Sequence, residues 1–159
     1  MIRPATPADV PLLVSLIREL AAYEHLTEQC HASEFLLAEH LFGDKPAAEA
    51  VILLSDTPEH AAVGYALYYP TFSTFLARPG LYLEDIYVQP GYRNRGLGKS
   101  VFAFLAKLCA ARNYGRLEWT VLDWNAPSIA FYETLGAKRM AEWQIMRLTG
   151  AELEKMGAA

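Results

Sequence analysis

The sequence predicts one α/β (α+β) domain, in which a mixed β-sheet carries helices on its faces. Its 159 residues fit a single domain, and 53% hydrophobic with 20% charged residues is the composition of a globular protein with a real core. The hydrophobic period changes from helical to alternating, returns to helical and then alternates again. The resulting order, β-α-α-β-β-β-α-β-α-β, is typical of a sheet covered by helices.

The N-terminal part is predicted to contain one short strand and two helices. Residues 2–3 form the strand, after which Thr6 suits a helix N-cap and Asp9 suits the acidic third position of a first turn. Apolar residues at helical spacing extend this first helix to about Tyr23. The second helix is expected over residues 34–42.

Three strands follow, because the apolar residues now alternate with polar ones. They are expected over residues 49–55, 62–69 and 81–88. Turns around Thr57-Pro58 and Pro79-Gly80 separate them, since proline and glycine favour turn geometry.

The C-terminal part alternates between helices and strands. A helix is expected over residues 98–112 and a strand over 116–123. A short helix then starts at the cap residue Asn125 and ends before Gly136, which suits a left-handed C-terminal cap. Residues 137–148 are expected to supply a final strand or hairpin.

Charge is distributed unevenly around a net value of −4, which argues against general binding of nucleic acids. Residues 19–59 hold nine acidic side chains and one basic one, whereas residues 93–117 hold six basic side chains and no acidic one. These segments are either solvated helix faces or two ligand regions. In the second case the basic region attracts a polyanion and the acidic region attracts a cation.

The strongest chemical signal lies in residues 83–100, LEDIYVQPGYRNRGLGKS. Arg93-x-x-Gly96-x-Gly98 stands between a strand and a helix, where glycines let the backbone approach a phosphate and the helix N-terminus attracts it. A Walker A loop needs glycine where Arg93 stands, and the Rossmann fingerprint needs glycine where Val101 stands, so both fail. A phosphate-binding turn of another kind is favoured over a glycine turn without a ligand.

Two carboxylates, Glu84 and Asp85, interrupt an otherwise apolar strand. Strand alternation predicts that they lie on opposite faces of the sheet, so that they do not share a role. Glu84 is either a general base or a structural residue on an edge strand or in an ion pair with an arginine.

The segment from Asp123 to Tyr132, DWNAPSIAFY, is the third signal. Asn125 and Ser128 belong to a helix start, where a ligand amide or phosphate could bind. Tyr132 lies one turn beyond Ser128 and is either a core aromatic or an acid whose phenol suits protonation of a departing thiolate.

Other residue types suggest few additional functions. Cys30 and Cys109 are too few for a disulfide framework, which favours a reduced cytoplasmic location. The N-terminus has no signal-peptide pattern and no apolar run approaches a membrane span. The four histidines show no spacing typical of metal ligands, so no metal is expected.

At these segments the chain resembles the GNAT superfamily of N-acetyltransferases, and more closely its spermidine/spermine branch, which includes diamine and thialysine acetyltransferases. The similar stretches are Ile2-Arg3-Pro4-Ala5-Thr6, Glu19-Leu20-Ala21, Tyr23-Glu24, Leu81-Tyr82-Leu83-Glu84-Asp85, Tyr92-Arg93, Gly96-Leu97-Gly98, Trp124-Asn125, Pro127-Ser128 and Phe131-Tyr132. The resemblance implies a GNAT-like mixed, mostly antiparallel twisted sheet flanked by helices on both faces, forming one domain over residues 1–159.

The resemblance also implies direct transfer of an acetyl group from acetyl-CoA to a primary amine of a small cationic acceptor, a diamine, polyamine or thialysine-like molecule. Glu84 is implied as the catalytic base and Tyr132 as the acid. The implied cofactor-binding residues are Ile86, Tyr87, Val88, Arg93, Asn94, Arg95, Gly96, Leu97, Gly98, Lys99, Asn125 and Ser128. The implied acceptor-binding residues are Tyr23, Glu24, Glu84 and Trp143. Members of this branch are typically homodimers.

Two other functions stay open. The same chemistry could act on a protein N-terminus, a lysine side chain or an antibiotic amine, although the acidic N-terminal half favours a small cation. A non-catalytic acyl-CoA-binding regulatory module is the second, and the presence of both Glu84 and Tyr132 argues against it.

Overall fold

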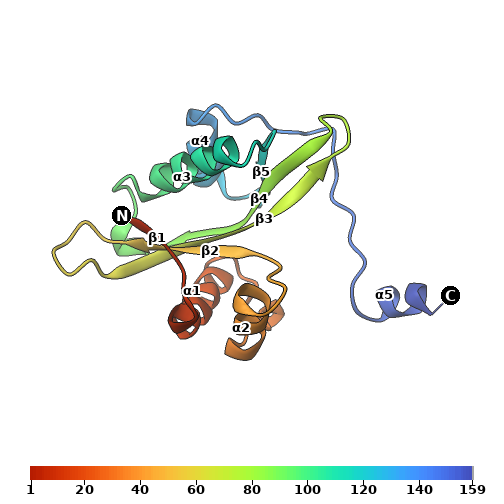
Figure 1. The fold of residues 1–159 in the computed structure, drawn as a ribbon, viewed down its shortest axis with the longest axis horizontal. Coiled ribbons are helices and arrows are strands. Elements are labelled where there is room, and N and C mark those ends of the chain that lie inside the picture. Colours follow the sequence, from red (N-terminus) through yellow and green to blue (C-terminus); the bar gives the residue numbers. More distant parts are fainter. Residues whose placement is uncertain (159) are drawn as a thin grey trace. The chain divides into compact units, whose positions relative to one another are not determined.

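A computed structural model describes residues 1–158 and contains one five-stranded sheet (Figure 1). The strands are β1 (Ile2–Pro4), β2 (Glu49–Leu54), β3 (Ala62–Ser73), β4 (Arg78–Val88) and β5 (Leu117–Trp119). They lie side by side in chain order. Strands β1 to β4 pair with one another in antiparallel fashion, and β5 pairs parallel to β4. The expected mixed, mostly antiparallel sheet is confirmed.

Helices cover the two faces of this sheet. They are α1 (Val10–Tyr23) and α2 (Glu34–Phe42) on one side and α3 (Leu97–Ala111) on the other (Figure 1). The bounds of α2 and the end of α1 agree with those predicted, whereas α1 starts at Val10, later than predicted, because Pro7–Asp9 form a separate 3-10 turn after Thr6. The interior positions of α1 recur every three or four residues, which turns one apolar stripe toward the sheet.

The core is divided between the two faces. On the side of α1 and α2, fully buried Leu13 and Ile52 pack in one cluster with Tyr65 and Tyr87. On the side of α3, the ring of Phe102 lies edge-on to Trp119 of β5, with centroids 4.7 Å apart. Both faces of the sheet are therefore buried by helices.

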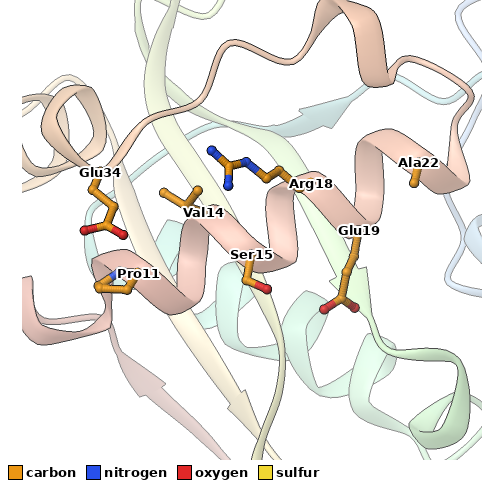
Figure 2. Close-up of a pocket in the computed structure, with 7 residues that line it drawn as sticks. All are labelled: Pro11, Val14, Ser15, Arg18, Glu19, Ala22 and Glu34. Atoms are coloured by element: carbon orange, nitrogen blue, oxygen red, sulfur yellow. The ribbon is translucent and has the colours of Figure 1, made fainter.

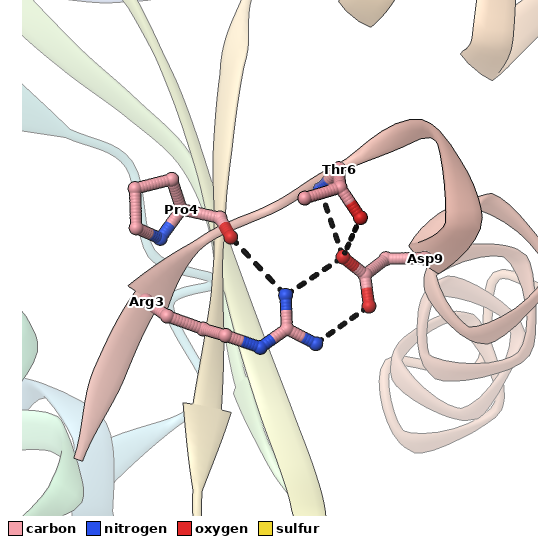
Figure 3. Close-up of polar contacts among 4 residues, drawn as sticks. All are labelled: Arg3, Pro4, Thr6 and Asp9. Carbon is pink, nitrogen blue, oxygen red and sulfur yellow. Dashed lines mark hydrogen bonds and ion pairs between the residues drawn. The ribbon is translucent and has the colours of Figure 1, made fainter.

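The start of the chain is fastened by an ion pair between β1 and the turn before α1 (Figure 3). The Arg3 guanidinium donates to both Asp9 carboxylate oxygens at 2.8 and 2.7 Å. Asp9 Oδ2 also accepts from the backbone N–H and the hydroxyl of Thr6, each at 2.8 Å. The Arg3 hydrogen bonds, assisted by those from Thr6, hold the pKa of Asp9 well below its usual range, although burial opposes them. Asp9 thus serves as the acidic first-turn residue predicted from the sequence.

The chain divides into two compact units, residues 1–120 and the part from Val121 onward. The first contains the sheet with α1, α2 and α3. The second contains α4 (Ala126–Thr134) and α5 (Gly150–Gly157). No helix among residues 1–158 is long and apolar enough to cross a membrane.

One predicted element is wrong. Residues 137–148 form neither a strand nor a hairpin, and within residues 1–158 no strand follows Trp119. Residues 138–148 are exposed, and a strand persists only where a neighbouring strand pairs with its backbone. Strand β5 is also shorter than predicted, whereas β3 and β4 are longer, because β3 and β4 pair with each other as far as Ser73 and Arg78. The turn predicted at Pro79-Gly80 is therefore wrong: both residues pair within β4, and the turn lies at residues 74–77.

Candidate functional site

A β-bulge interrupts β4 in the middle of the sheet. Leu67 of β3 pairs with Asp85, but the next residue of β3, Tyr68, pairs with Leu83. Glu84 is therefore the extra residue of β4. A bulge of this kind shifts the alternation of side chains and is common beside functional sites.

The bulge brings the two carboxylates of β4 to one face of the sheet. Tyr65 donates its hydroxyl to Asp85 Oδ2 at 3.0 Å, and Tyr69 donates its hydroxyl to Glu84 Oε2 at 3.1 Å. Tyr65 and Tyr69 are four residues apart on β3 and so point to the same side. The predicted placement of Glu84 and Asp85 on opposite faces is wrong, because regular alternation does not continue through a bulge.

Burial and neighbouring charge act strongly on Asp85. Loss of solvation raises its pKa to about 6, with the charges of Glu84 and Glu24 adding to the rise and the Tyr65 hydrogen bond opposing it. Burial also raises the pKa of Glu24, the residue after the last turn of α1. The pKa of Tyr69 rises to about 12, through burial and then through the charge of Glu84 and its hydrogen bond.

These side chains form an acidic cluster of Glu24, Glu84 and Asp85, with the hydroxyls of Tyr65 and Tyr69 as donors. Sequence reasoning named Glu24 and Glu84 but gave no site role to Asp85, Tyr65 or Tyr69. The signal for Asp85 was the pair of acids in an apolar strand. The bulge that gives Asp85 its place was not visible in that pattern.

The edge of β4 that faces β5, opposite its edge with β3, is unpaired beyond Leu83. Strand β5 pairs with β4 only from Leu81 to Leu83. Past that point, residues 84–88 have no strand partner on the β5 side among the described residues. The backbone N–H and C=O groups of this edge can pair with an extended ligand, as in β-strand addition.

The segment after β4 leads into the N-terminus of α3, where the backbone is unusually accessible. Gly96 is the N-cap with a φ of +79°, and a Cβ at this position would meet no atom within 4 Å. Asn94 is also left-handed, with a φ of +61°. The first N–H groups of α3 have no partner within the helix, and Arg95 and Lys99 are exposed beside them. This arrangement fits an anionic group such as a pyrophosphate.

Arg93 connects this segment to the end of α1. Its Nε–H donates to the Val88 carbonyl oxygen at 2.9 Å. Its guanidinium lies 4.7 Å from the centroid of the Tyr23 ring and 5.7 Å from that of Tyr87. The structure thus brings together Arg93, expected near the cofactor, and Tyr23, expected near the acceptor.

Glu19 of α1 forms hydrogen bonds to the end of β4 and to the residue that follows it. Its carboxylate accepts from the Tyr87 hydroxyl at 3.1 Å and from Gln89 Nε2 at 3.2 Å. Glu19 also borders a hollow over the exposed side of α1, drawn in Figure 2. The residues that line this hollow are Pro11, Val14, Ser15, Arg18, Glu19, Ala22 and Glu34.

The remaining predicted site residues lie in the second unit. Asn125 is buried and caps α4, its Oδ1 accepting from the Ser128 N–H at 3.3 Å, as predicted. Tyr132 follows Ser128 by one helical turn, and its ring centroid is 5.5 Å from that of Phe131. Trp143 is 70% exposed in the irregular segment between α4 and α5. Among residues 1–158, no group of three or more side chains has the arrangement of a metal site.

Known proteins resemble this chain in sequence and in fold. A protein-family model described as the acetyltransferase (GNAT) family matches residues 16–137. The thialysine N-epsilon-acetyltransferase of Bos taurus is 36% identical, over 98% of this chain and 96% of its own length. The L-ornithine N5-acetyltransferase NATA1 of Arabidopsis thaliana is 34% identical, over 96% of this chain and 86% of its own length. An integron cassette protein from the mobile metagenome of V. cholerae superposes with a TM-score of 0.81 over 100% of this chain and 98% of its own, at 24% identity.

Proposed function

The chain belongs to the GNAT family of acetyltransferases, and on that premise we propose that it transfers the acetyl group of acetyl-CoA to a primary amine of a small cationic molecule. The acceptor is a diamine, a polyamine or an amino acid with a terminal amine, such as ornithine or thialysine. Relatives whose names specify ornithine and thialysine as acceptors support this range.

The acidic cluster beside the open edge of β4 carries the proposal. Glu24 and Glu84 lie near enough to Asp85 for their charges to raise its pKa, and the Arg93 guanidinium lies over the rings of Tyr23 and Tyr87. A small cationic amine is attracted to such a cluster, whereas the uncharged backbone and side chains of a peptide acceptor would gain no electrostatic attraction from it. The neighbouring edge of β4 gives an extended thioester substrate a place to bind.

Acetyl-CoA would bind at the open edge of β4 and at the N-terminus of α3, both in the first unit. Backbone groups of Ile86, Tyr87 and Val88 would pair with its extended arm, because that edge of β4 lacks a strand. Residues 94–99 would hold its pyrophosphate, where the α3 N-terminus and two basic side chains favour negative charge. By resemblance, Asn125 and Ser128 of the second unit would also contact the cofactor. When bound, acetyl-CoA supplies an activated acetyl group on a thioester.

Side chains of the protein would remove the proton from the amine and protonate the departing sulfur during a direct transfer. A carboxylate of the bulge, Glu84 by resemblance, removes the proton that blocks the lone pair of the acceptor ammonium. The Val88 N–H polarises the carbonyl that the amine attacks. Tyr132 gives its phenol proton to the departing sulfur, and Tyr23 and Trp143 line the acceptor.

The test is amine-dependent release of thiol from acetyl-CoA by the purified chain. The acceptors are ornithine, thialysine, putrescine, spermidine, lysine and a short peptide with a free N-terminus. We expect saturable turnover on at least one of the small cationic amines. Glu84→Gln should lower kcat/KM for that amine, because the site would lose a carboxylate that acts on the acceptor ammonium. Tyr132→Phe should lower kcat by about 10²-fold or more, because it would lose a proton donor.

Other results would favour the alternatives. Turnover on the peptide alone would make the chain a protein N-terminal acetyltransferase. Tight acetyl-CoA binding without consumption of any amine, measured by calorimetry, would indicate a non-catalytic acyl-CoA-binding module.

We further propose that the two units form one catalytic domain in a cytoplasmic homodimer. The family match crosses the unit boundary, and both cysteines are free thiols. Large apolar side chains are exposed in the segment after α4, a composition that a partner subunit would cover. They are Met140, Trp143, Ile145, Met146 and Leu148. Light scattering should give twice the 17.7 kDa mass of the chain, thermal unfolding should occur in one transition, and cell fractionation should place the protein in the cytosol.

A further inference from the structure

We propose that Asp85 accepts the proton from the acceptor ammonium, and that Glu84 and Glu24 hold the positive charge of the acceptor. This assignment rests on the proposed function and moves the catalytic base by one residue from the expected Glu84. It follows from the bulge, which places both carboxylates on one face of the sheet but in different surroundings.

The two carboxylates differ in how firmly they are held. Asp85 is partly buried, and its Oδ2 accepts from Tyr65, whose side chain is fully buried and fixed in the core. The Tyr65 hydrogen bond is made to Oδ2, so that Oδ1 is the second proton-accepting oxygen of a carboxylate that is already held in place. Glu84 is exposed on a longer side chain, and its hydrogen bond to Tyr69 lies at the surface. A fixed, partly desolvated carboxylate suits proton transfer better than a mobile, hydrated one.

The charged groups around Asp85 also support its assignment as the base. The groups that face it are Tyr65 on β3, Glu84 beside it on β4 and Glu24 at the end of α1. Cys30 lies close enough to act on Tyr65 in turn. Because burial and two neighbouring acids raise the pKa of Asp85 to about 6, this group changes charge just below neutral pH. A base needs that property in order to accept and then release a proton in each turnover.

The proton and electron balance is simple. An N–H bond of the ammonium breaks, its electron pair stays on nitrogen, and the proton forms an O–H bond on Asp85 Oδ1. The freed lone pair forms the new C–N bond as the C–S bond breaks, and Tyr132 protonates the sulfur. The amide nitrogen then releases its second ammonium-derived proton and keeps the electron pair, and this proton restores the Tyr132 phenol. Asp85 loses its proton to water before the next turnover.

Two matched tyrosine variants test which carboxylate titrates. Tyr65→Phe removes the hydrogen bond to Asp85, and Tyr69→Phe removes the equivalent bond to Glu84. Because the Tyr65 hydrogen bond favours ionised Asp85, its loss should move the acidic limb of the kcat/KM profile for the amine to higher pH. The limb should stay in place in Tyr69→Phe. A limb that moves with Tyr69→Phe and not with Tyr65→Phe would overturn the proposal.

Carboxamide variants separate proton transfer from binding. Asp85→Asn should lower kcat by about 10²- to 10⁴-fold, leave KM for acetyl-CoA unchanged and abolish the acidic limb. Glu84→Gln should retain that limb and act mainly on KM for the amine. The reverse pattern would return the role of base to Glu84.

A direct titration keeps the assignment testable if a variant fails to fold. Carbon-13 NMR of the aspartate carboxyls in the wild-type protein should show one group with a midpoint near pH 6, the value to which burial raises the pKa of Asp85. That signal should be absent in Asp85→Asn or move upward in Tyr65→Phe. Its absence from the wild type would refute the assignment. If the wild type consumes no amine at all, the proposed function fails, whatever this titration shows.

Discussion

Asp85 is a residue whose ionisation opposes folding. Burial and the charges of Glu84 and Glu24 raise its pKa to about 6, so the folded state binds its proton more tightly than the unfolded state. The stability gained from protonated Asp85 is fully present below the unfolded pKa near 4 and is lost as pH rises through about 6.

We therefore predict that Asp85→Asn stabilises the protein at neutral pH. Asparagine keeps the shape and can still accept from Tyr65, but it carries no charge. A change of about two pKa units corresponds to roughly 2–3 kcal/mol at pH 8, and this gain should vanish near pH 4. Urea unfolding at both pH values measures it. Equal effects at both pH values would show that charge is not the cause.

Arg93 and Arg95 provide a contrast between a held and an exposed arginine. Arg93 donates to the Val88 carbonyl and lies against two tyrosine rings. Arg95 contacts the Tyr92 ring and forms a 3.5 Å ion pair with an exposed carboxylate. Arg93→Ala should lower the free energy of unfolding by about 2 kcal/mol, from one charged hydrogen bond and a cation–π contact, and Arg95→Ala by less than about 0.5 kcal/mol.

Arg93→Lys distinguishes shape from charge in the same measurement. Lysine lacks the planar group that stacks on Tyr23 and the Nε–H that reaches Val88, so most of the loss should remain. Full recovery of stability by lysine would show that only the positive charge matters.

At the scale of elements, strand β4 and helix α3 divide the proposed site between them. In that proposal the open edge of β4 would bind the extended arm of acetyl-CoA, and the α3 N-terminus would hold its pyrophosphate. The connection turns at Gly96, whose left-handed φ of +79° is favourable for glycine and strained for other residues.

Gly96→Ala therefore tests backbone conformation without steric conflict, since a Cβ there meets no atom within 4 Å. We expect a loss of about 1–2 kcal/mol from the left-handed φ and a higher KM for acetyl-CoA. Gly91→Ala is the control, because Gly91 is equally open but has no positive φ. Its stability should be unchanged or slightly greater. Equal losses in both variants would exclude backbone strain as the cause.

At the scale of the whole molecule, opposite charges are separated along the chain. Residues 19–59 are acidic and residues 93–117 are basic, although the net charge is only −4. Each proposed substrate, the cationic amine and the anionic acetyl-CoA, is thus drawn to charge of the opposite sign.

We predict that salt weakens the binding of both substrates. Raising ionic strength from about 0.02 to about 0.5 M shortens the Debye length several-fold and should raise KM for each substrate several-fold. The value of kcat should change little, because the reacting groups lie within the site. Steady-state kinetics with an uncharged amine as acceptor provides the control. If its KM shows the same dependence as that of the cationic acceptor, charge attraction is not the reason.

The sequence by itself determined the elements and the chemistry of single segments. Periodicity located α1 and α2, the change of period located β2 to β4, and the pattern around Arg93 and Gly96 predicted an anion site before a helix. These are local properties, because helix caps, turns and apolar spacing act over a few residues.

Tertiary structure decided what depends on pairing between strands. The bulge at Glu84 exists only because Tyr68 pairs with Leu83 and Leu67 pairs with Asp85. A strand or hairpin was expected over residues 137–148, but without a neighbouring strand to pair with, this segment forms none. The register of a sheet is set by partners distant in sequence. One added residue in that register changes which carboxylates share a face. The position of Asp85 beside Glu84 in the proposed site could therefore be recognised only in the tertiary structure.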